Sequence, residues 1–391
     1  MTTTISGTVA PGFEPVGEAF REAFSGHERM GAALAVRVGG APVVDLHGGV
    51  RDVRTAEPWQ ADTLNVVFSC TKGLTALLAA RLVQEGRLDY QAPVSAYWPE
   101  FAQAGKHGVL VRHVLGHRAG LNAPTRDFTT DELLDWSTVT TALAEQAPLW
   151  QPGYAYAYHA ITQGWLAGEI IRRVTGMTPG AYFAELVAEP LGVEAWIGLP
   201  PALEPRVAHL TVGATLQALI DTQVAARTPG DVDWPDRAMT LGGALPAALV
   251  SEHGGFNDPR LHAVEFPAAG GIATARALAT IWSATVVAEG GVRLLDDDTL
   301  DDALRVQSDG QPFFTAPPPW PRWGMGFQLD SEARRYLTPA SFGHDGAGGQ
   351  VAFADPVHDV GFAFVTNVME ADDPRATRII DALRGCLLTR S

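Results

Sequence analysis

Apolar residues recur at two different spacings along the chain. Residues 33–38 and 42–46 are apolar or alternating on either side of Gly39-Gly40, which predicts a β-hairpin. From Lys72 to Gly86 the spacing is helical, which predicts a helix with a broad apolar face formed by Leu74, Leu77, Leu78, Leu82 and Val83. The N-terminal part of the chain therefore contains antiparallel sheet followed by a buried helix.

The middle of the chain has mainly helical spacing. It predicts helices at about 111–115, 130–146, 161–175, 179–189 and 274–288, after an earlier one at about 16–24. Prolines interrupt residues 88–101, where we expect irregular structure. Between 205 and 265 the periodicity weakens and Pro-Gly, Trp-Pro and Gly-Gly pairs occur, so we expect long loops there.

Strand patterns return near the C-terminus. They predict strands at 324–329, 351–355 and 360–366, followed by a helix at 375–388. Sheet at both ends with helices between them predicts an α+β fold with an antiparallel sheet flanked by helices. We expect residues 1–85 and 300–391 to form one α/β domain. Residues 86–299 would form a mainly helical domain with substrate-pocket loops, and the active site would lie between the two.

Composition limits the classes of function. The chain has 391 residues, 46% of them hydrophobic, which is ample for a large core. Its formal charge of −16 argues against nucleic acid or an anionic membrane as a partner. Two cysteines, no signal-peptide pattern and no long apolar run predict a cytoplasmic protein. Whether it forms a homo-oligomer is left open by the sequence.

The stretch Val67–Gly73 carries the strongest chemical signal. It is typical of a strand running into a helix, and Ser69 and Lys72 form an S-x-x-K pattern there. A lysine one turn after a serine lies on the same face and can act as its base. The helix N-terminus and the Ser69 N–H can stabilise an oxyanion. The alternative is an ordinary helix start with a surface lysine, and Cys70 is better explained by packing than as a nucleophile.

Further motifs follow in a fixed order. Tyr158-His159-Ala160 precedes a predicted helix, and His344-Asp345-Gly346 lies between predicted strands. Shorter signatures occur at 89–101, 115–121, 270–271 and 323–327. Together with the S-x-x-K box, this series resembles the serine β-lactamase and penicillin-binding-protein superfamily. Within it, the chain most resembles class C β-lactamase-like carboxylesterases, known as family VIII esterases, whose boxes these segments match in order.

The resemblance implies a role for each box. Ser69 would attack the acyl carbon, and Lys72 and Tyr158 would move its proton, with the choice of base left open. The backbone N–H groups of Ser69 and Ala347 would form the oxyanion hole. The third box, His344, Asp345 and Gly346, would orient the substrate or Tyr158. Tyr154 and Tyr156 are alternatives to Tyr158, which is favoured because it alone has the family spacing to a helix.

Two departures from the family's lactamases bear on the substrate. Their second box ends in asparagine and their third begins with lysine, and these groups contact the antibiotic's amide and carboxylate; here the residues are Ala160 and His344. The sequence therefore predicts a serine carboxylesterase for small to medium, mostly uncharged esters. Alternatives are a β-lactamase, amidase, peptidase or acyltransferase, or a non-catalytic binding protein. A Ser-His-Asp hydrolase is not supported, because no serine lies in G-x-S-x-G.

Neither a cofactor nor a metal is expected. His113 and His117 are four residues apart, the spacing of a two-histidine metal face, but the sequence offers no third ligand nearby. We expect residues 120–160 and 205–265 to shape the substrate pocket, with walls provided by Trp136, Trp150 and Trp234. The only expected partner is a small-molecule ester.

Overall fold

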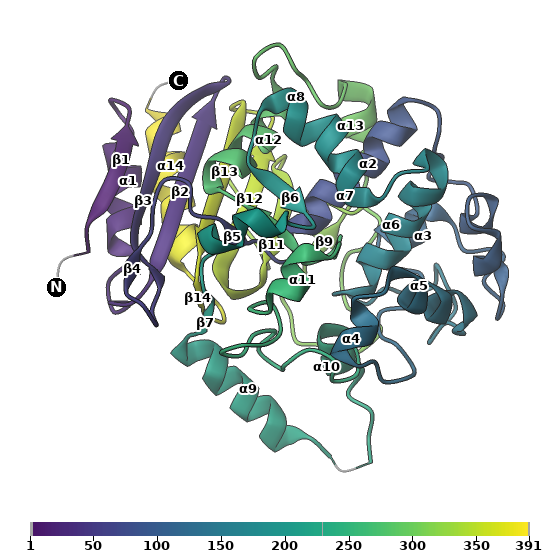
Figure 1. Ribbon diagram of the computed structural model, residues 1–391. Helices are drawn as coiled ribbons and strands as arrows, with labels where there is room; N and C mark the ends of the chain where they lie inside the picture. The colour runs from purple at the N-terminus through teal and green to yellow at the C-terminus, as the bar shows by residue number, and fades with distance from the viewer. Residues whose placement is uncertain (1–2, 229, 390–391) are drawn as a thin grey trace.

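The largest element is an antiparallel sheet built from both ends of the chain (Figure 1). The computed structural model describes residues 3–228 and 230–389. Within them the sheet has nine strands in the order β1-β3-β2-β13-β12-β11-β10-β9, with β4 paired to β3. These strands are β1 Ile5–Val9, β2 Gly31–Val38, β3 Ala41–Asp52, β4 Glu57–Pro58, β9 Arg322–Trp323, β10 Gln328–Leu329, β11 Phe342–Gly346, β12 Gln350–Asp355 and β13 Val360–Thr366.

The predicted hairpin is confirmed, and one of its strands pairs with a strand from the C-terminal part of the chain. Gly39 and Gly40 connect β2 to β3 with φ of 56° and 79°, the left-handed conformation that a tight hairpin turn requires. On its other edge β2 pairs with β13, so that Ala32 lies opposite Thr366. The antiparallel sheet expected from both ends of the sequence is therefore present.

Helices cover both faces of the sheet. On one face α1 and α14 pack over a cluster that includes Phe20, Phe353 and Ile379. On the other, α12 packs against β2, β12 and β13, and the larger core extends from there into the helical part of the molecule (Figure 1). The described helices are α1 Glu14–Glu22, α2 Cys70–Gln84, α3 Val111–Leu115, α4 Thr130–Leu133, α5 Trp136–Glu145, α6 Thr162–Thr175, α7 Pro179–Phe183, α8 Glu189–Leu191, α9 Ala214–Ala226, α10 Trp234–Thr240, α11 Pro259–Ala263, α12 Ala275–Val286, α13 Asp297–Ala303 and α14 Arg375–Leu388.

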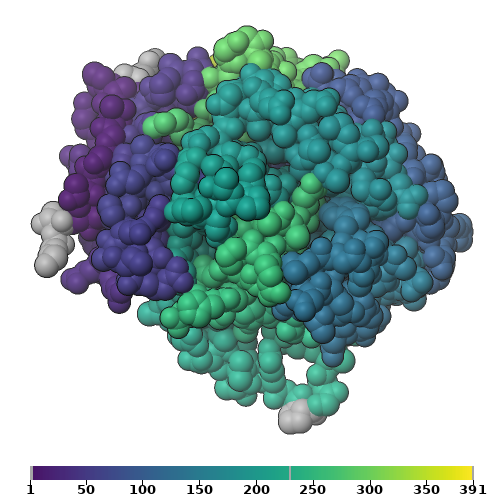
Figure 2. All heavy atoms as spheres, viewed as in Figure 1, coloured from purple at the N-terminus to yellow at the C-terminus, as the bar shows by residue number. Residues whose placement is uncertain are grey.

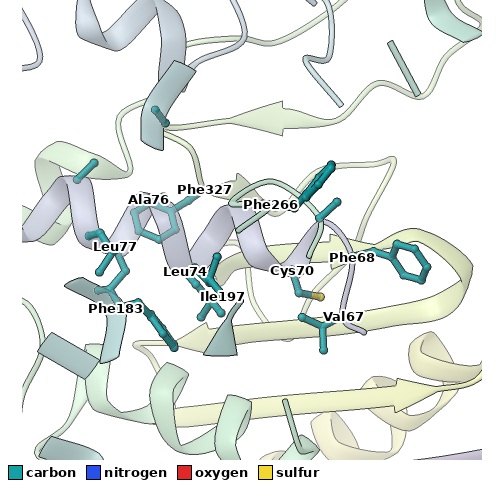
Figure 3. Packing of buried hydrophobic residues seen from close by; sticks show 14 of the residues in the cluster. Val67, Phe68, Cys70, Leu74, Ala76, Leu77, Phe183, Ile197, Phe266 and Phe327 are labelled. Atoms are coloured by element: carbon teal, nitrogen blue, oxygen red, sulfur yellow. The ribbon is translucent and has the colours of Figure 1, made fainter. Parts of the chain in front are cut away.

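Helix α2 is buried on nearly every side. Leu74 and Leu77 lie near Phe183 of α7 and Ile197 of β6, while Phe327 lies near Ala76 (Figure 3). The helix packs against β11 of the sheet and against α6 and α13. A helix that is apolar all round belongs in the interior. The buried helix expected from the sequence is thus confirmed, although it begins at Cys70 rather than Lys72.

Two small sheets complete the framework. Strands β5 Asn65–Val66, β8 Gly271–Ala273 and β6 Ala195–Ile197 form one, and β7 Thr211–Val212 pairs with β14 Val368–Met369 in the other. The first of them fixes the approach to the S-x-x-K box, because β5 ends three residues before Ser69 and pairs with β8.

The expectation of long loops between 205 and 265 is only partly confirmed, because residues 241–258 belong to no helix or strand but the rest of the segment is largely helical. That segment contains α9, α10 and α11. Helix α9 projects from the lower edge of the molecule, and Leu219 and Val224 remain exposed on it (Figures 1 and 2). Leu216 packs against the large core, but no residue of α9 is fully buried, so the helix has no strong apolar stripe and gives only a weak periodic signal. The single helix expected at 130–146 is wrong, because Asp135 caps a new helix there and divides it into α4 and α5.

The division into two domains at residues 86 and 299 stays a prediction. Helix α12 lies within the proposed helical part yet packs on the sheet, so the large core runs across the proposed boundary. Among the described helices, none combines the length and apolar character needed to cross a bilayer.

Candidate active site

Ser69 lies on a strained turn between β5 and α2. Phe68 has φ of 45°, a conformation that costs a non-glycine residue about 1–3 kcal/mol. It is held there by its edge-to-face ring contact with Phe256, at 5.3 Å between ring centroids, and by a bridge to Gly270. Ser69 follows as the residue before α2, half-buried rather than enclosed. The turn therefore presents the Ser69 side chain at the N-terminus of a buried helix.

Lys72 reaches back to Ser69 from the first turn of α2. Its Nζ lies 3.0 Å from the Ser69 Oγ. It also donates to the backbone carbonyls of Ala160, at 2.5 Å, and Ala268, at 2.9 Å. The side chain is completely buried, and this burial lowers the pKa of Lys72 well below its usual value. The reading of Lys72 as an ordinary surface lysine is wrong.

Tyr158 approaches Ser69 from the opposite segment. Its hydroxyl donates to the Ser69 Oγ at 2.9 Å. Burial raises the pKa of the Tyr158 phenol above its usual value, which keeps the proton on the oxygen. The two rival tyrosines are placed elsewhere: Tyr154 is 79% exposed, and the Tyr156 hydroxyl donates to the carbonyl of Gly310. Tyr158 is therefore the member of this group that contacts Ser69.

Aromatic rings hold Tyr158 in place. Trp323 stacks on it with 5.2 Å between ring centroids and 12° between ring planes. His117 meets its edge at 4.9 Å, and the Lys72 Nζ lies 4.9 Å from the centre of the ring. His117 accepts a hydrogen bond on Nδ1 from the His159 N–H at 3.2 Å. This arrangement gives His117 a supporting position behind Tyr158.

The third box brings a strand against the serine turn. Gly346 ends β11 so close to the turn that a Cβ there would lie 2.2 Å from the Val67 carbonyl oxygen. Only glycine permits this approach. Ala347 follows at the start of a short 3₁₀ turn, Ala347–Gly349. The predicted oxyanion pair, Ser69 and Ala347, is thus carried by two segments in direct contact, and its role stays a prediction.

His344 and Asp345 face different surroundings. The Nδ1 of buried His344 donates to its neighbour's carbonyl at 2.6 Å, and its Nε2 has no hydrogen-bond partner among the described residues. Burial lowers the pKa of His344 to about 3, so the ring is neutral. The Asp345 carboxylate forms an ion pair with Arg334 and accepts from the Tyr336 hydroxyl at 3.2 Å. These contacts suit Asp345 to supporting β11.

Cys70 does not compete with Ser69. Its thiol is buried and donates to the carbonyl of His344 at 3.1 Å. Burial raises the pKa of Cys70 well above its usual value, which leaves the thiol protonated. Residues 3–228 and 230–389 contain no group of three acidic, histidine or cysteine side chains placed to hold a metal ion.

An apolar pocket of about 300 Å³ opens beside Tyr158. It is lined by Asn122 and by residues from three segments, 156–160, 235–239 of α10 and the proline-rich stretch 312–323. Residues from both regions expected to shape a substrate pocket, 120–160 and 205–265, line this one, but Trp136, Trp150 and Trp234 are not among the lining residues. Trp234 instead stacks behind the lining residue Phe314, at 6.4 Å.

Sequence reasoning missed several parts of this site. Trp323 was part of a recognised signature but was given no role. The sequence gives no recognisable signal for the carbonyl of Ala268 or for the pocket wall 312–321, because backbone carbonyls and proline-rich segments are common in proteins. It also gives none for the pair Arg334 and Tyr336, which supports Asp345. The tryptophan in Trp-Gly-Met-Gly-Phe, 323–327, was the available clue.

Comparison with known proteins identifies the family and the fold. A family model described as beta-lactamase matches residues 16–384. The chain is 37% identical to the esterase/beta-lactamase LipL of Mycobacterium tuberculosis, over 93% of this chain and 83% of that protein. Among solved structures, a family VIII carboxylesterase is 34% identical with a TM-score of 0.84, covering 98% of this chain and all of the other.

EstA of Arthrobacter nitroguajacolicus is 30% identical with a TM-score of 0.83, and the match covers both chains completely. The fold is therefore that of β-lactamases and penicillin-binding proteins, as expected. The chain belongs to the beta-lactamase family, as a serine hydrolase of the family VIII esterase and beta-lactamase-like group.

Proposed function

We propose that this protein is a serine carboxylesterase that hydrolyses small to medium, uncharged esters through an acyl-enzyme on Ser69. One observation carries the proposal: the Ser69 Oγ lies within hydrogen-bond distance of both the Lys72 Nζ and the Tyr158 hydroxyl. A nucleophile in contact with a base and a proton donor is the arrangement that acyl transfer requires. The relatives named as esterases support the same class of substrate.

Lys72 is the better candidate for the base. Burial lowers the pKa of its amine and raises that of the Tyr158 phenol, which favours a neutral pair. A neutral amine has two N–H groups and one lone pair. The carbonyls of Ala160 and Ala268 accept the two N–H bonds, and the lone pair then faces the Ser69 hydroxyl. This pairing uses every polar group of Lys72.

Acylation then proceeds with a complete proton balance. Lys72 takes the Ser69 proton while Oγ attacks the ester carbonyl, and the N–H groups of Ser69 and Ala347 stabilise the resulting oxyanion. When the bond to the leaving oxygen breaks, Tyr158 gives its proton to the alkoxide and recovers one from Lys72. The alcohol leaves and the acyl group remains on Oγ.

Deacylation reverses the roles. A water molecule takes the position of the departed alcohol, and its proton passes through Tyr158 to Lys72 as its oxygen attacks the acyl carbon. The Ser69 Oγ leaves with the proton that Lys72 holds, which restores the free enzyme and releases a carboxylic acid. Microscopic reversibility requires the same two residues in both steps.

Two side chains favour an ester over a charged lactam. Ala160 offers no amide to a substrate, although its carbonyl binds Lys72. His344 is neutral because burial lowers its pKa to about 3, so it supplies no cation for a carboxylate. A neutral ester loses nothing at these positions, whereas an anionic lactam loses two contacts.

The test compares wild type with Ser69→Ala on p-nitrophenyl butyrate and on a chromogenic cephalosporin. Ester turnover should be fast and should fall by roughly 10³-fold or more in the variant, with an unchanged circular dichroism spectrum. Ser25→Ala, an exposed serine, is the matched control. Wild-type ester turnover in well-folded Ser69→Ala would remove Ser69 as the nucleophile.

Hydrolysis of β-lactams is the second candidate, because LipL, at 37% identity, is named as both an esterase and a β-lactamase. The cephalosporin arm of the same experiment decides it. A kcat on cephalosporin comparable to that on the ester would favour the lactamase assignment.

A further inference from the structure

One wall of the apolar pocket beside Tyr158, the segment 312–321, is held by hydrogen bonds. The Phe313 N–H donates to the Tyr156 carbonyl at 2.7 Å, which joins the segment 312–321 to the irregular segment that carries Tyr158. The Trp320 Nε1 donates to the Ala316 carbonyl at 2.9 Å. Prolines at 312, 317, 318, 319 and 321 restrict the backbone further. These contacts connect the proline-rich stretch to the segment that carries Tyr158.

The chemistry of the wall selects a neutral ligand. Among the described residues that line the pocket none is charged, and most are proline, alanine or aromatic residues such as Phe314, Trp320 and Trp323. Asn122 is the one amide, 1% exposed, and its Oδ1 has no partner among the described residues. A volume of about 300 Å³ suits a small apolar group.

The position of the pocket identifies which part of an ester enters it. Tyr158 lines the pocket, and in the proposed mechanism its hydroxyl protonates the departing oxygen. Ser69 and Ala347, the two residues of the proposed oxyanion hole, are not among the lining residues. A group extending from the leaving oxygen past Tyr158 therefore enters the pocket.

We propose that this pocket binds the alcohol portion of the substrate, and that the preferred alcohol is neutral, apolar and larger than an ethyl group. The inference rests on the proposed esterase function and adds the leaving-group specificity to it. Met239 of α10, half-buried at the pocket wall, is then a residue that determines specificity.

The experiment holds the acyl group constant and varies the alcohol. kcat/KM is measured on ethyl acetate, 3,3-dimethylbutyl acetate and acetylcholine by titrating the acid released. The last two have the same shape and differ in one charge. We expect kcat/KM on 3,3-dimethylbutyl acetate to exceed that on ethyl acetate by about tenfold or more. It should also exceed that on acetylcholine, although the choline ester is chemically the more reactive.

Two variants and a series of acyl groups test whether the alcohol preference arises at this pocket. Met239→Trp fills the pocket and should reduce the ratio of 3,3-dimethylbutyl to ethyl acetate by about fivefold or more. Val357→Trp, at an exposed turn, should leave that ratio as in wild type. On ethyl butyrate and ethyl hexanoate, Met239→Trp should change the acyl preference far less than the alcohol preference.

Each contrary outcome has its own meaning. If Met239→Trp loses the acyl preference but keeps the alcohol preference, the acyl group occupies the pocket and the inference is overturned. A preference for acetylcholine would overturn the assignment of a neutral alcohol, because aromatic walls can also bind a quaternary ammonium. Failure to hydrolyse any of these esters would instead contradict the proposed function.

Discussion

Trp323 lies flat against Tyr158, with 5.2 Å between ring centroids and 12° between their planes. The tryptophan belongs to the short edge strand β9, whereas the tyrosine belongs to an irregular segment before α6. Stacking fixes the plane of the tyrosine ring and so the direction of its hydroxyl toward Ser69. The geometry of the candidate site thus depends on a contact between residues 165 positions apart in sequence, Tyr158 and Trp323.

Replacing Trp323 should therefore impair turnover through Tyr158. Trp323→Leu removes the flat surface, and we expect kcat on p-nitrophenyl butyrate to fall by roughly tenfold or more, since small losses of orientation are costly. Trp323→Phe keeps an aromatic face and should retain most of kcat. Steady-state kinetics with both variants check this. Equal kcat values in Trp323→Leu and wild type would show that the stacking does not position the hydroxyl.

Removing the Tyr158 hydroxyl tests its proton transfer directly. Tyr158→Phe preserves the stacked ring, so we expect kcat to fall by roughly 10²–10⁴-fold with a much smaller change in KM. Tyr154→Phe removes an equivalent hydroxyl from a residue that is 79% exposed and should leave kcat unchanged. Should kcat survive in Tyr158→Phe, Lys72 alone would have to carry the proton to the leaving oxygen.

The pH dependence of kcat/KM reports on Lys72. Burial lowers the pKa of this amine, and only its neutral form can accept the Ser69 proton. Activity should therefore be present above the lowered pKa and be lost as the pH falls through it. The acidic limb of the profile should inflect well below the pKa of an ordinary lysine, about 10.4. Lys72→Arg stays charged and should be inactive across the range. An inflection near that ordinary value would contradict the assignment.

The parts of this structure that were predictable come from local signals. The hairpin at Gly39-Gly40 and the buried helix after Ser69 follow from the spacing of apolar residues, and the pair Ser69 and Lys72 needs only one helical turn to meet. Tyr158 could be identified only through the resemblance to a family, because the residues around it in the sequence do not indicate that it contacts Ser69.

The remaining features depend on contacts between distant segments. The Ala268 carbonyl that binds Lys72 is a backbone group, which any residue would supply. Helix α9 contains no fully buried residue, so its sequence has only a weak periodic signal. The pocket wall 312–321 lacks both helical and strand spacing, and its function depends on where it lies rather than on its own pattern. Such features follow from tertiary placement, which a single sequence does not encode locally.

Buried neutral histidines should make the fold sensitive to acid. Burial lowers the pKa of His344 to about 3 and that of His159 to about 4, whereas in the unfolded chain both titrate near 6.5. Between these values the unfolded state binds more protons, so the free energy of unfolding falls as the pH drops below about 6.5. Each histidine contributes a slope of up to about 1.4 kcal/mol per pH unit.

Urea unfolding at several pH values between 7 and 4.5 measures this slope. His344→Gln removes one titrating group and should flatten the dependence relative to wild type. His253→Gln, whose side chain is 76% exposed, serves as the control and should leave the slope as it is. If His344→Gln and wild type lose stability in parallel, His344 is not the group that takes up the proton on unfolding.

The ion pair between Arg334 and Asp345 should stabilise β11, the strand that carries Gly346 toward the serine turn. The two side chains are only 16% and 23% exposed, and the Arg334 Nη1 also donates to the Thr377 hydroxyl at 3.0 Å. Arg334→Met leaves the Asp345 carboxylate without its cation in a poorly solvated place. We expect the free energy of unfolding to fall by about 2 kcal/mol, less than for a fully buried pair.

A double-mutant cycle separates the pair from its surroundings. Asp345→Asn in the Arg334→Met background removes the unpaired charge, so the double variant should be less destabilised than the sum of the single variants. Arg335→Met changes the adjacent arginine, which is 62% exposed, and should cost less than about 1 kcal/mol. Strict additivity of Arg334→Met and Asp345→Asn would mean that the two groups do not stabilise each other, and that the strand is held by Tyr336 and by its pairing with β10 and β12.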